Sequence, residues 1–410
     1  MYTPSDFGVF AIASSPLAIL ITVTCLTYEN AIPLPESDDA AANVLALCLV
    51  LTLLLSSATA VVLWFAGPAL FALAEAAVLS PYAMLLVLGQ LGGGFVIAFT
   101  GWAVRTRSYS EIAANRLTQS VTLVGGQLGT GALGAGAPGL LIGSVAGSIA
   151  GSSRLGRAAW RSHAQSFRRV SRMGMVTAAG RYRRFAILSA PSAFLNTLGL
   201  QAPLLLVIFL YGTNVGGEFT LAQRVIALPA TLVAGAIGQV FFAEAAALAR
   251  EPTAELSALF WRTTRLLLLA VMAIGPCVLA AIVSPLLFPI LFGQNWLEAG
   301  AYVAILAPMY YLQFVTSPTG GTLDVLERQD LHLIREVFRL CVLGGSVVLA
   351  ASLHLPSIGA VGAVSIAGCL TYSLYGVLSW RAIVGHDASG TSSPMADRDI
   401  VKDFSDWPSP

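Results

Sequence analysis

Of the 22 lysine and arginine residues in the chain, all but Arg224 fall on one side of a single membrane topology. The topology comes from eleven hydrophobic stretches, most of which supply the roughly 20 apolar residues that a helix needs to cross a bilayer. When the connections are numbered alternately, one set holds the other basic residues, and the opposite set, with residues 1–6, holds none. Short basic loops stay in the cytoplasm, so we expect the N-terminus outside and the C-terminus inside. The predicted helices are 7–27, 42–66, 82–102, 116–135, 137–153, 185–212, 219–246, 263–284, 299–320, 332–352 and 358–380.

Composition independently favours a membrane protein. Hydrophobic residues make up 56% of the chain and charged residues only 10%, whereas soluble domains contain about 25% charged residues. We therefore expect an all-α, multi-pass protein of the bacterial inner membrane. It divides into an N-terminal transmembrane lobe of five helices, a basic cytoplasmic linker, a C-terminal lobe of six helices and a disordered cytoplasmic tail. The boundaries are 1–153, 154–184, 185–384 and 385–410.

A short repeat relates the two lobes. The pattern GxFxxA occurs at 8–13, near the start of the first predicted helix, and again at 217–222, 209 residues later. Internal repeats are common in transporters. If the repeat is real, the first lobe is one helix short, and we expect a further helix of about 20 residues to precede Met1. The alternative is a true eleven-helix protein.

Segment 125–151 is rich in glycine. Gly139, Gly143, Gly147 and Gly151 form a ridge of small residues on one helix face, which lets another backbone approach closely. A phosphate cradle is the alternative, but neither a preceding strand nor a terminal Lys-Ser/Thr pair is present. Helix packing is the favoured interpretation.

The basic linker 154–184 contains nine arginines and no acidic residue. A cation near anionic headgroups can contribute about 1 kcal/mol to membrane binding. We interpret the linker as a topology determinant that also contacts lipid. The alternative is that it captures an anionic lipid headgroup on the cytoplasmic face.

Arg224 is the exception to the charge rule. It lies five residues beyond the start of its predicted helix, on the outer side, where a charge is costly unless it meets water or a partner. It either extends to the outer interface, paired with Glu218, or faces a cavity and binds an anion. The spacing to Glu218 is not that of a helical ion pair, so we favour anion binding.

Further polar side chains lie within the same two predicted helices. Asn196 and Gln201 lie in the helix 185–212, and Gln223 and Gln239 lie in the helix 219–246. Such groups need partners or water inside a membrane, so they either bond across helices or line a cavity that contacts sugar hydroxyls. Glu244 is a candidate coupling-ion site, although an ordinary interfacial carboxylate is the favoured interpretation.

No set of residues suggests catalysis. The four histidines are scattered in loops or at helix ends, and the five cysteines show no metal-ligand spacing. We expect neither enzyme activity nor a metal, a cofactor or a nucleic-acid partner.

Two segments carry a resemblance to a known family. They are 182–203, which opens with Tyr-Arg-Arg-Phe, and 216–246, which reads GGEFTLAQRVIALPATLVAGAIGQVFFAEAA. Similarity extends over 3–8, 28–35, 291–300 and 317–318 and covers nearly all of 1–384. The pattern resembles the polysaccharide-biosynthesis branch of the multidrug/oligosaccharidyl-lipid/polysaccharide exporter superfamily, the O-antigen-type flippases.

The resemblance implies twelve helices in two six-helix lobes around a cavity that opens alternately to either face; this chain departs from it by the missing first helix. The implied activity is flipping of a polyprenyl-diphosphate-linked oligosaccharide from the cytoplasmic to the outer leaflet, for polysaccharide or lipopolysaccharide biosynthesis. Membrane lipids, polysaccharide polymerases and glycosyltransferases are the partners it suggests. Related flippases use cationic cavity residues for the diphosphate, and Arg224 matches by helix and depth.

Two other functions compete with this one. A drug or cation exporter of the same superfamily would favour an acidic cavity, and acidic residues are scarce in the middle of the predicted helices. A membrane-embedded polysaccharide polymerase or ligase would need charged residues on a substantial outer loop, and the predicted outer loops are short.

Overall fold

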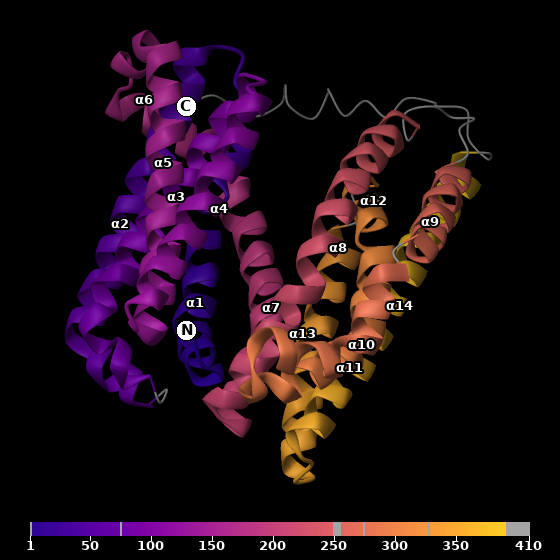
Figure 1. The fold of residues 1–410 in the computed structure, drawn as a ribbon. Coiled ribbons are helices and arrows are strands. Elements are labelled where there is room, and N and C mark those ends of the chain that lie inside the picture. The colour runs from indigo at the N-terminus through magenta and orange to yellow at the C-terminus, as the bar shows by residue number, and fades with distance from the viewer. Residues whose placement is uncertain (1, 74–75, 249–255, 274, 327–328, 391–410) are drawn as a thin grey trace. The chain divides into compact units, whose positions relative to one another are not determined.

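The computed structural model describes residues 2–73, 76–248, 256–273, 275–326 and 329–390, and every regular element within these ranges is helical (Figure 1). The first half contains α1 (Pro4–Val23), α2 (Asp38–Leu73), α3 (Ala83–Arg105), α4 (Tyr109–Ala132), α5 (Gly136–Arg168), α6 (Arg172–Arg181) and α7 (Ala190–Tyr211). The second half contains α8 (Thr213–Leu248), α9 (Leu256–Ala273), α10 (Gly275–Phe292), α11 (Leu297–Thr316), α12 (Thr322–Val325), α13 (Gln329–Ser352) and α14 (Ser357–Gly390).

Short 3-10 and π-helical turns connect several of these elements. Turns of 3-10 helix occupy Tyr28–Ala31, Ala77–Tyr82, Gln294–Trp296 and Pro318–Gly321, and a π-helical turn at Phe185–Ser189 leads into α7. Six segments of the described chain are long and apolar enough to cross a membrane. They are Pro4–Ala31, Asp38–Leu73, Ala77–Arg105, Phe185–Tyr211, Gln294–Thr316 and Ser357–Gly385.

Within the described residues the eleven predicted stretches are helical, but two boundaries differ from the prediction. The predicted stretch 263–284 falls on α9, described up to Ala273, and α10, described from Gly275. Helix α5 continues to Arg168 and is followed by α6, so most of the basic linker is helical. Helix α14 extends to Gly390, so residues 385–390 are helical, whereas 391–410 lie outside the described residues.

The chain forms two compact units. The first contains Met1–Val225, Ala280–Leu306 and Glu336–Gly368, and the second contains Ile226–Leu279, Ala307–Arg335 and Cys369–Pro410. The first unit therefore includes α1 to α7, the basic linker and the opening turns of α8. Arg224, the Arg339 cluster and the groove of α3, α4 and α5, which are described below, consist of residues of this first unit.

Within the first unit, α1 to α5 lie side by side and α6 lies at one end of them (Figure 1). The N-terminus of α1 is fixed by a capping box, in which Thr3 and Asp6 satisfy each other's backbone N–H groups. Asp6 also accepts a hydrogen bond of 3.0 Å from the backbone N–H of Ala137, at the start of α5. One carboxylate therefore joins the first turns of α1 and α5.

The glycine ridge of α5 packs against α4, as predicted. A Cβ at Gly143 would meet Gln127 and the carbonyl oxygen of Leu123, and one at Gly147 would lie 3.0 Å from the carbonyl oxygen of Gln119. Gly126 of α4 packs directly on Gly143, because a Cβ at Gly126 would lie 2.9 Å from the Gly143 Cα. The ridge is a backbone-to-backbone helix contact.

The GxFxxA repeat meets its own copy where α1 and α8 begin. A Cβ at Gly8 would overlap the carbonyl oxygen of Thr213, and a Cβ at Gly217 would overlap the carbonyl oxygen of Pro4. The two contacts are equivalent, because the repeat offset of 209 residues relates Gly8 to Gly217 and Pro4 to Thr213. The short sequence match therefore marks a reciprocal, pseudo-twofold helix crossing.

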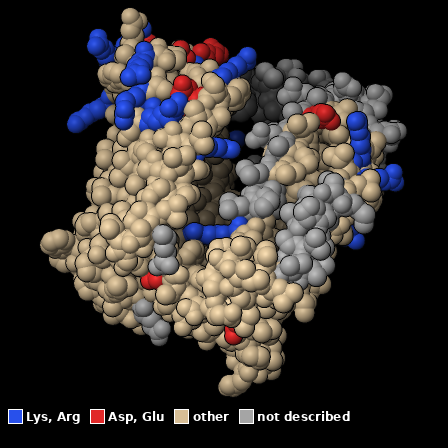
Figure 2. Space-filling model, viewed as in Figure 1, with Lys and Arg blue, Asp and Glu red and all other residues tan. Residues whose placement is uncertain are grey.

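Basic side chains gather at one end of the N-terminal helices. Figure 2 shows blue residues around the end where α6 lies, whereas the opposite end of these helices is almost entirely uncharged on the visible face. Acidic residues from the start of α2 pair with this basic cluster: Arg169 lies 2.8 Å from Asp39, and Arg105 lies 2.9 Å from Asp38. The Asp39 carboxylate raises the pKa of Arg169 above its ordinary value through this contact.

Candidate functional site

Arg224 lies on α8, half-buried, against the first turns of α1. Its guanidinium carbon lies 5.6 Å from the ring centre of Phe7 and 5.1 Å from that of Phe10. Phe7 in turn packs edge-to-face on Trp296, with ring centres 5.3 Å apart. Aromatic faces attract a cation, so α1 supplies a wall that holds the arginine in place.

No carboxylate among the described residues lies within ion-pair distance of Arg224. Glu218, which the sequence offered as a surface partner, makes no ion pair with it in the described structure. A guanidinium carries five N–H donors in a planar fork, and aromatic rings satisfy none of them fully. The position therefore retains donors for an anionic ligand.

A second arginine, Arg339, meets one of the predicted site residues. Its Nη2 donates 2.6 Å to the side-chain oxygen of Asn196 and 2.7 Å to the Asn196 backbone carbonyl. Arg339 also forms an ion pair with Glu336, one helical turn earlier on α13. Both side chains are almost fully buried, with 6% of Arg339 and 1% of Glu336 exposed.

The guanidinium of Arg339 lies over Gly199, three residues beyond Asn196 on α7. A Cβ at Gly199 would lie 3.2 Å from Nε and 3.3 Å from Nη2 of Arg339. The absence of a side chain at Gly199 is what lets the arginine reach Asn196. This polar cluster fixes α7 to α13 within the first unit.

The two arginines occupy different levels of that unit. Helices α1 and α7 run antiparallel: Thr22 near the end of α1 meets Thr197 near the start of α7 at 3.1 Å, and Ser5 near the start of α1 meets Thr213, two residues beyond the end of α7, at 3.5 Å. Along α1, Arg224 lies at the height of Phe10. The Arg339 cluster lies at the height of Thr22, because Thr22 contacts Thr197, the residue after Asn196. A helix rises 1.5 Å per residue, so these levels are roughly 18 Å apart.

The other predicted site residues with described side chains, Gln201, Gln223 and Glu244, have no such partners among the described residues. Gln201 and Gln223 are half-buried, on α7 and α8. Glu244 is exposed and belongs to the second unit. The side chain of Gln239 lies outside the described residues. Of the predicted residues whose side chains are described, Arg224 and Asn196 have defined side-chain contacts.

Sequence reasoning missed Arg339, because it counted Arg335 and Arg339 among the basic residues that mark the cytoplasmic side. Both are buried: Arg339 is 5% exposed, and Arg335, in the second unit, is 9% exposed with its guanidinium 4.6 Å from the ring centre of Tyr375. The available signal was Glu336, which has the helical spacing of an ion pair with Arg339 inside a predicted span.

The Arg339 contact gives a stability prediction. Gly199→Ala should push the guanidinium away from Asn196 and lower the free energy of unfolding by about 1–2 kcal/mol. Gly345→Ala is the matched control on α13, because a Cβ there meets nothing within 4 Å. Thermal unfolding of both variants in detergent checks this; equal stability of the two would show that Arg339 adjusts without cost.

The comparisons with known proteins agree on a family and a fold. The family model described as "Polysaccharide biosynthesis protein" matches residues 1–301. Comparison with curated proteins finds no match.

Solved structures share the fold at low sequence identity. A multidrug resistance MATE family transporter of the MOP superfamily, in an inward-facing conformation, superposes with a TM-score of 0.67 at 16% identity, over 95% of this chain and 93% of that one. The lipid II flippase MurJ, in an inward closed conformation, gives a TM-score of 0.67 at 14% identity, over 95% of this chain and 85% of that one. A MATE structure in a bent conformation gives 0.61 at 14% identity, covering 95% of each chain.

Proposed function

Because the chain belongs to the polysaccharide biosynthesis protein family, we propose that it flips a polyprenyl-diphosphate-linked oligosaccharide from the cytoplasmic to the outer leaflet. The family and the fold are those of a transporter and not of an enzyme. The proposal depends on one observation, the environment of Arg224 on α8. Its guanidinium lies over the rings of Phe7 and Phe10 and has no carboxylate partner among the described residues.

The substrate class follows from what crosses a bilayer with difficulty. A diphosphate and a string of hydroxyl groups cannot enter hydrocarbon unaided, since each unpaired polar group costs several kcal/mol. The polyprenyl chain can remain in the lipid. The protein therefore needs to solvate only the diphosphate and the sugars while they cross.

Arg224 is the proposed diphosphate ligand. A guanidinium forms two parallel hydrogen bonds to phosphate oxygens, and Phe7 and Phe10 hold the fork in a fixed orientation without neutralising it. Gln223, Asn196, Gln201 and Gln239 are proposed to contact sugar hydroxyls, and Glu244 is the proposed coupling-ion residue. In Asn196 the side-chain oxygen is engaged by Arg339, which leaves its amide N–H groups as donors.

The proposed topology completes the mechanism. The chain is a multi-pass membrane protein, and the segregation of its cations supports eleven crossings in two lobes, with the basic linker and the C-terminus in the cytoplasm. Alternating access through rocking of the lobes would carry the headgroup from one face to the other. Polysaccharide polymerases or glycosyltransferases would supply or consume the lipid-linked glycan.

The proposal is tested in cells by depleting the protein and measuring lipid-linked oligosaccharide on each face with a non-permeant glycan-modifying reagent. We expect the oligosaccharide to accumulate on the inner face and to return to the outer face on re-expression. An unchanged distribution, together with loss of resistance to a cationic drug, would instead identify the chain as a drug exporter.

A further inference from the structure

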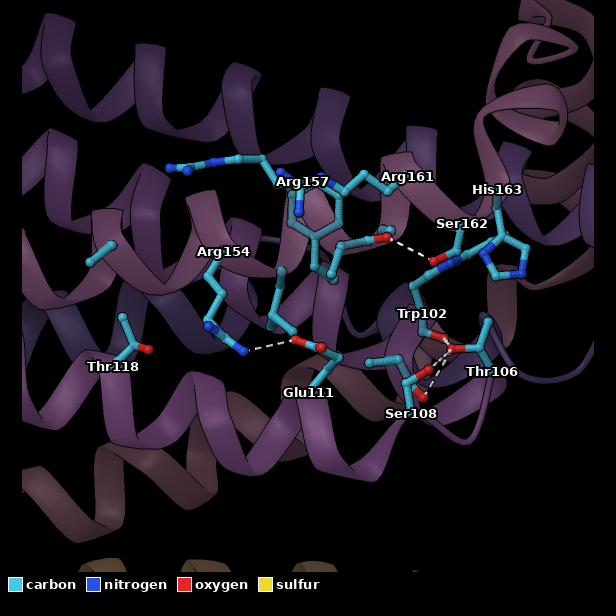
Figure 3. Close-up of a pocket in the computed structure, with 16 residues that line it drawn as sticks. Trp102, Thr106, Ser108, Glu111, Thr118, Arg154, Arg157, Arg161, Ser162 and His163 are labelled. Atoms are coloured by element: carbon cyan, nitrogen blue, oxygen red, sulfur yellow. Dashed lines mark hydrogen bonds and ion pairs between the residues drawn. The ribbon is translucent and has the colours of Figure 1, made fainter.

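A groove separate from Arg224 lies where α3, α4 and α5 come together at the basic end of the first unit. It encloses about 570 Å³. Helix α5 lines it with Arg154, Arg157, Arg161 and His163, while α3 contributes Trp102 and α4 contributes Glu111 (Figure 3).

The groove carries more positive than negative charge. Three arginines line it against one carboxylate, Glu111, which pairs with Arg154 at 3.1 Å. In the described part of the chain, Arg157 and Arg161 have no carboxylate within ion-pair distance. Their spacing of four residues places them on one face of α5, and both are exposed enough to reach a ligand from outside.

The inner wall of the groove holds buried nitrogen atoms without hydrogen-bond partners among the described residues. They are Nε1 of Trp102, Nε of Arg154 and Nδ1 of His163. Trp102 is only 1% exposed, and its ring meets the His163 ring edge-on at 5.3 Å. These nitrogens are closed off from solvent, so they form a polar layer behind the groove, and the exposed arginines of α5 are the groups that can reach a ligand.

The backbone of α5 is shaped around this wall. His163 has non-helical angles of φ −135° and ψ 31°, and the helix kinks there. Here the kink places His163 against Trp102, at the same groove that the arginines of the preceding turns line.

We propose that this groove binds a phosphate group through the exposed guanidinium groups of Arg157 and Arg161. Phosphate oxygens accept several charge-assisted hydrogen bonds at once, and only the Arg154–Glu111 pair offsets the positive charge of the site. The phosphate belongs either to an anionic phospholipid headgroup or to a soluble phosphate compound. The site stands apart from the export proposal, because none of its residues is assigned to the moving substrate.

The test uses the full-length protein in detergent, with native mass spectrometry to count bound phosphatidylglycerol and phosphatidylcholine. The groove variant Arg157→Gln/Arg161→Gln keeps the Arg154–Glu111 ion pair. Its control, Arg168→Gln/Arg172→Gln, removes the same charge from exposed positions of the same basic segment. We expect about tenfold weaker phosphatidylglycerol binding in the groove variant and a change of less than about twofold in the control.

A second arm identifies the source of the phosphate. Inorganic phosphate and glycerol phosphate are titrated against the same proteins, with thermal stability as the readout. Stabilisation of the wild type that the groove variant loses supports a soluble ligand, whereas lipid binding without it supports a headgroup. The proposal is overturned if neither probe distinguishes the groove variant from its control.

Discussion

Arg224→Ala should abolish export of the lipid-linked oligosaccharide while leaving the protein inserted in the membrane. Loss of a two-point, charge-assisted contact with phosphate costs about 2–3 kcal/mol, which corresponds to about 30- to 150-fold weaker binding. Arg224→Lys should retain part of the activity, because it keeps the charge but loses the planar fork. Export is measured by the outer-face pool of glycan in cells that carry only the variant.

Two controls separate binding from folding in that experiment. Arg168→Ala removes an exposed arginine outside the proposed substrate site and outside the groove, and it should export normally. The amount of variant in the membrane fraction and its elution as a single species report folding; Arg224 contributes only about 0.5–1 kcal/mol through an aromatic contact. Full export by a normally inserted Arg224→Ala protein would remove the residue from the mechanism.

The second large effect is expected at the crossing of α1 and α8. Gly8→Ala and Gly217→Ala should each lower the free energy of unfolding by about 2–3 kcal/mol, because each new Cβ overlaps a backbone carbonyl that cannot rotate away. Gly125→Ala and Gly129→Ala on α4 are matched controls, since a Cβ at either position meets nothing within 4 Å. Thermal unfolding in detergent provides the comparison.

The reciprocity of the crossing makes a sharper prediction. If the two glycines pack at one pseudo-twofold contact, the first substitution already forces the helices apart, and the second then costs less. The double variant Gly8→Ala/Gly217→Ala should therefore be destabilised by less than the sum of the single variants, with a coupling of at least about 0.5 kcal/mol. Strict additivity, or a cost at only one glycine, would contradict the reciprocal contact.

The helices and the glycine ridge that packs α5 against α4 could largely be predicted from the sequence. Spanning length and charge segregation located all eleven helical stretches, because the bilayer imposes both. The ridge from Gly139 to Gly151 was predicted as a packing face, since small residues at every fourth position have few other uses in a membrane helix.

The candidate site could be predicted only in part. Arg224 was found because it violates the charge rule, whereas Arg339 was missed because it obeys the rule while being buried against Asn196. The groove of α3, α4 and α5 was also missed, because the sequence does not show that Trp102 and Glu111 lie beside the arginines of α5. Contacts between helices far apart in the chain decide both cases, and one sequence does not determine them.

The most direct measurement of the central claim is flipping by the purified protein in proteoliposomes. A fluorescent polyprenyl-diphosphate oligosaccharide is incorporated into both leaflets, and its accessibility to a non-permeant glycan-oxidising reagent is followed over time. The account predicts that the wild type exposes the inner-leaflet pool and that Arg224→Ala matches protein-free vesicles. Wild-type vesicles that expose the glycan no faster than protein-free ones, while transporting a cationic drug, would contradict it.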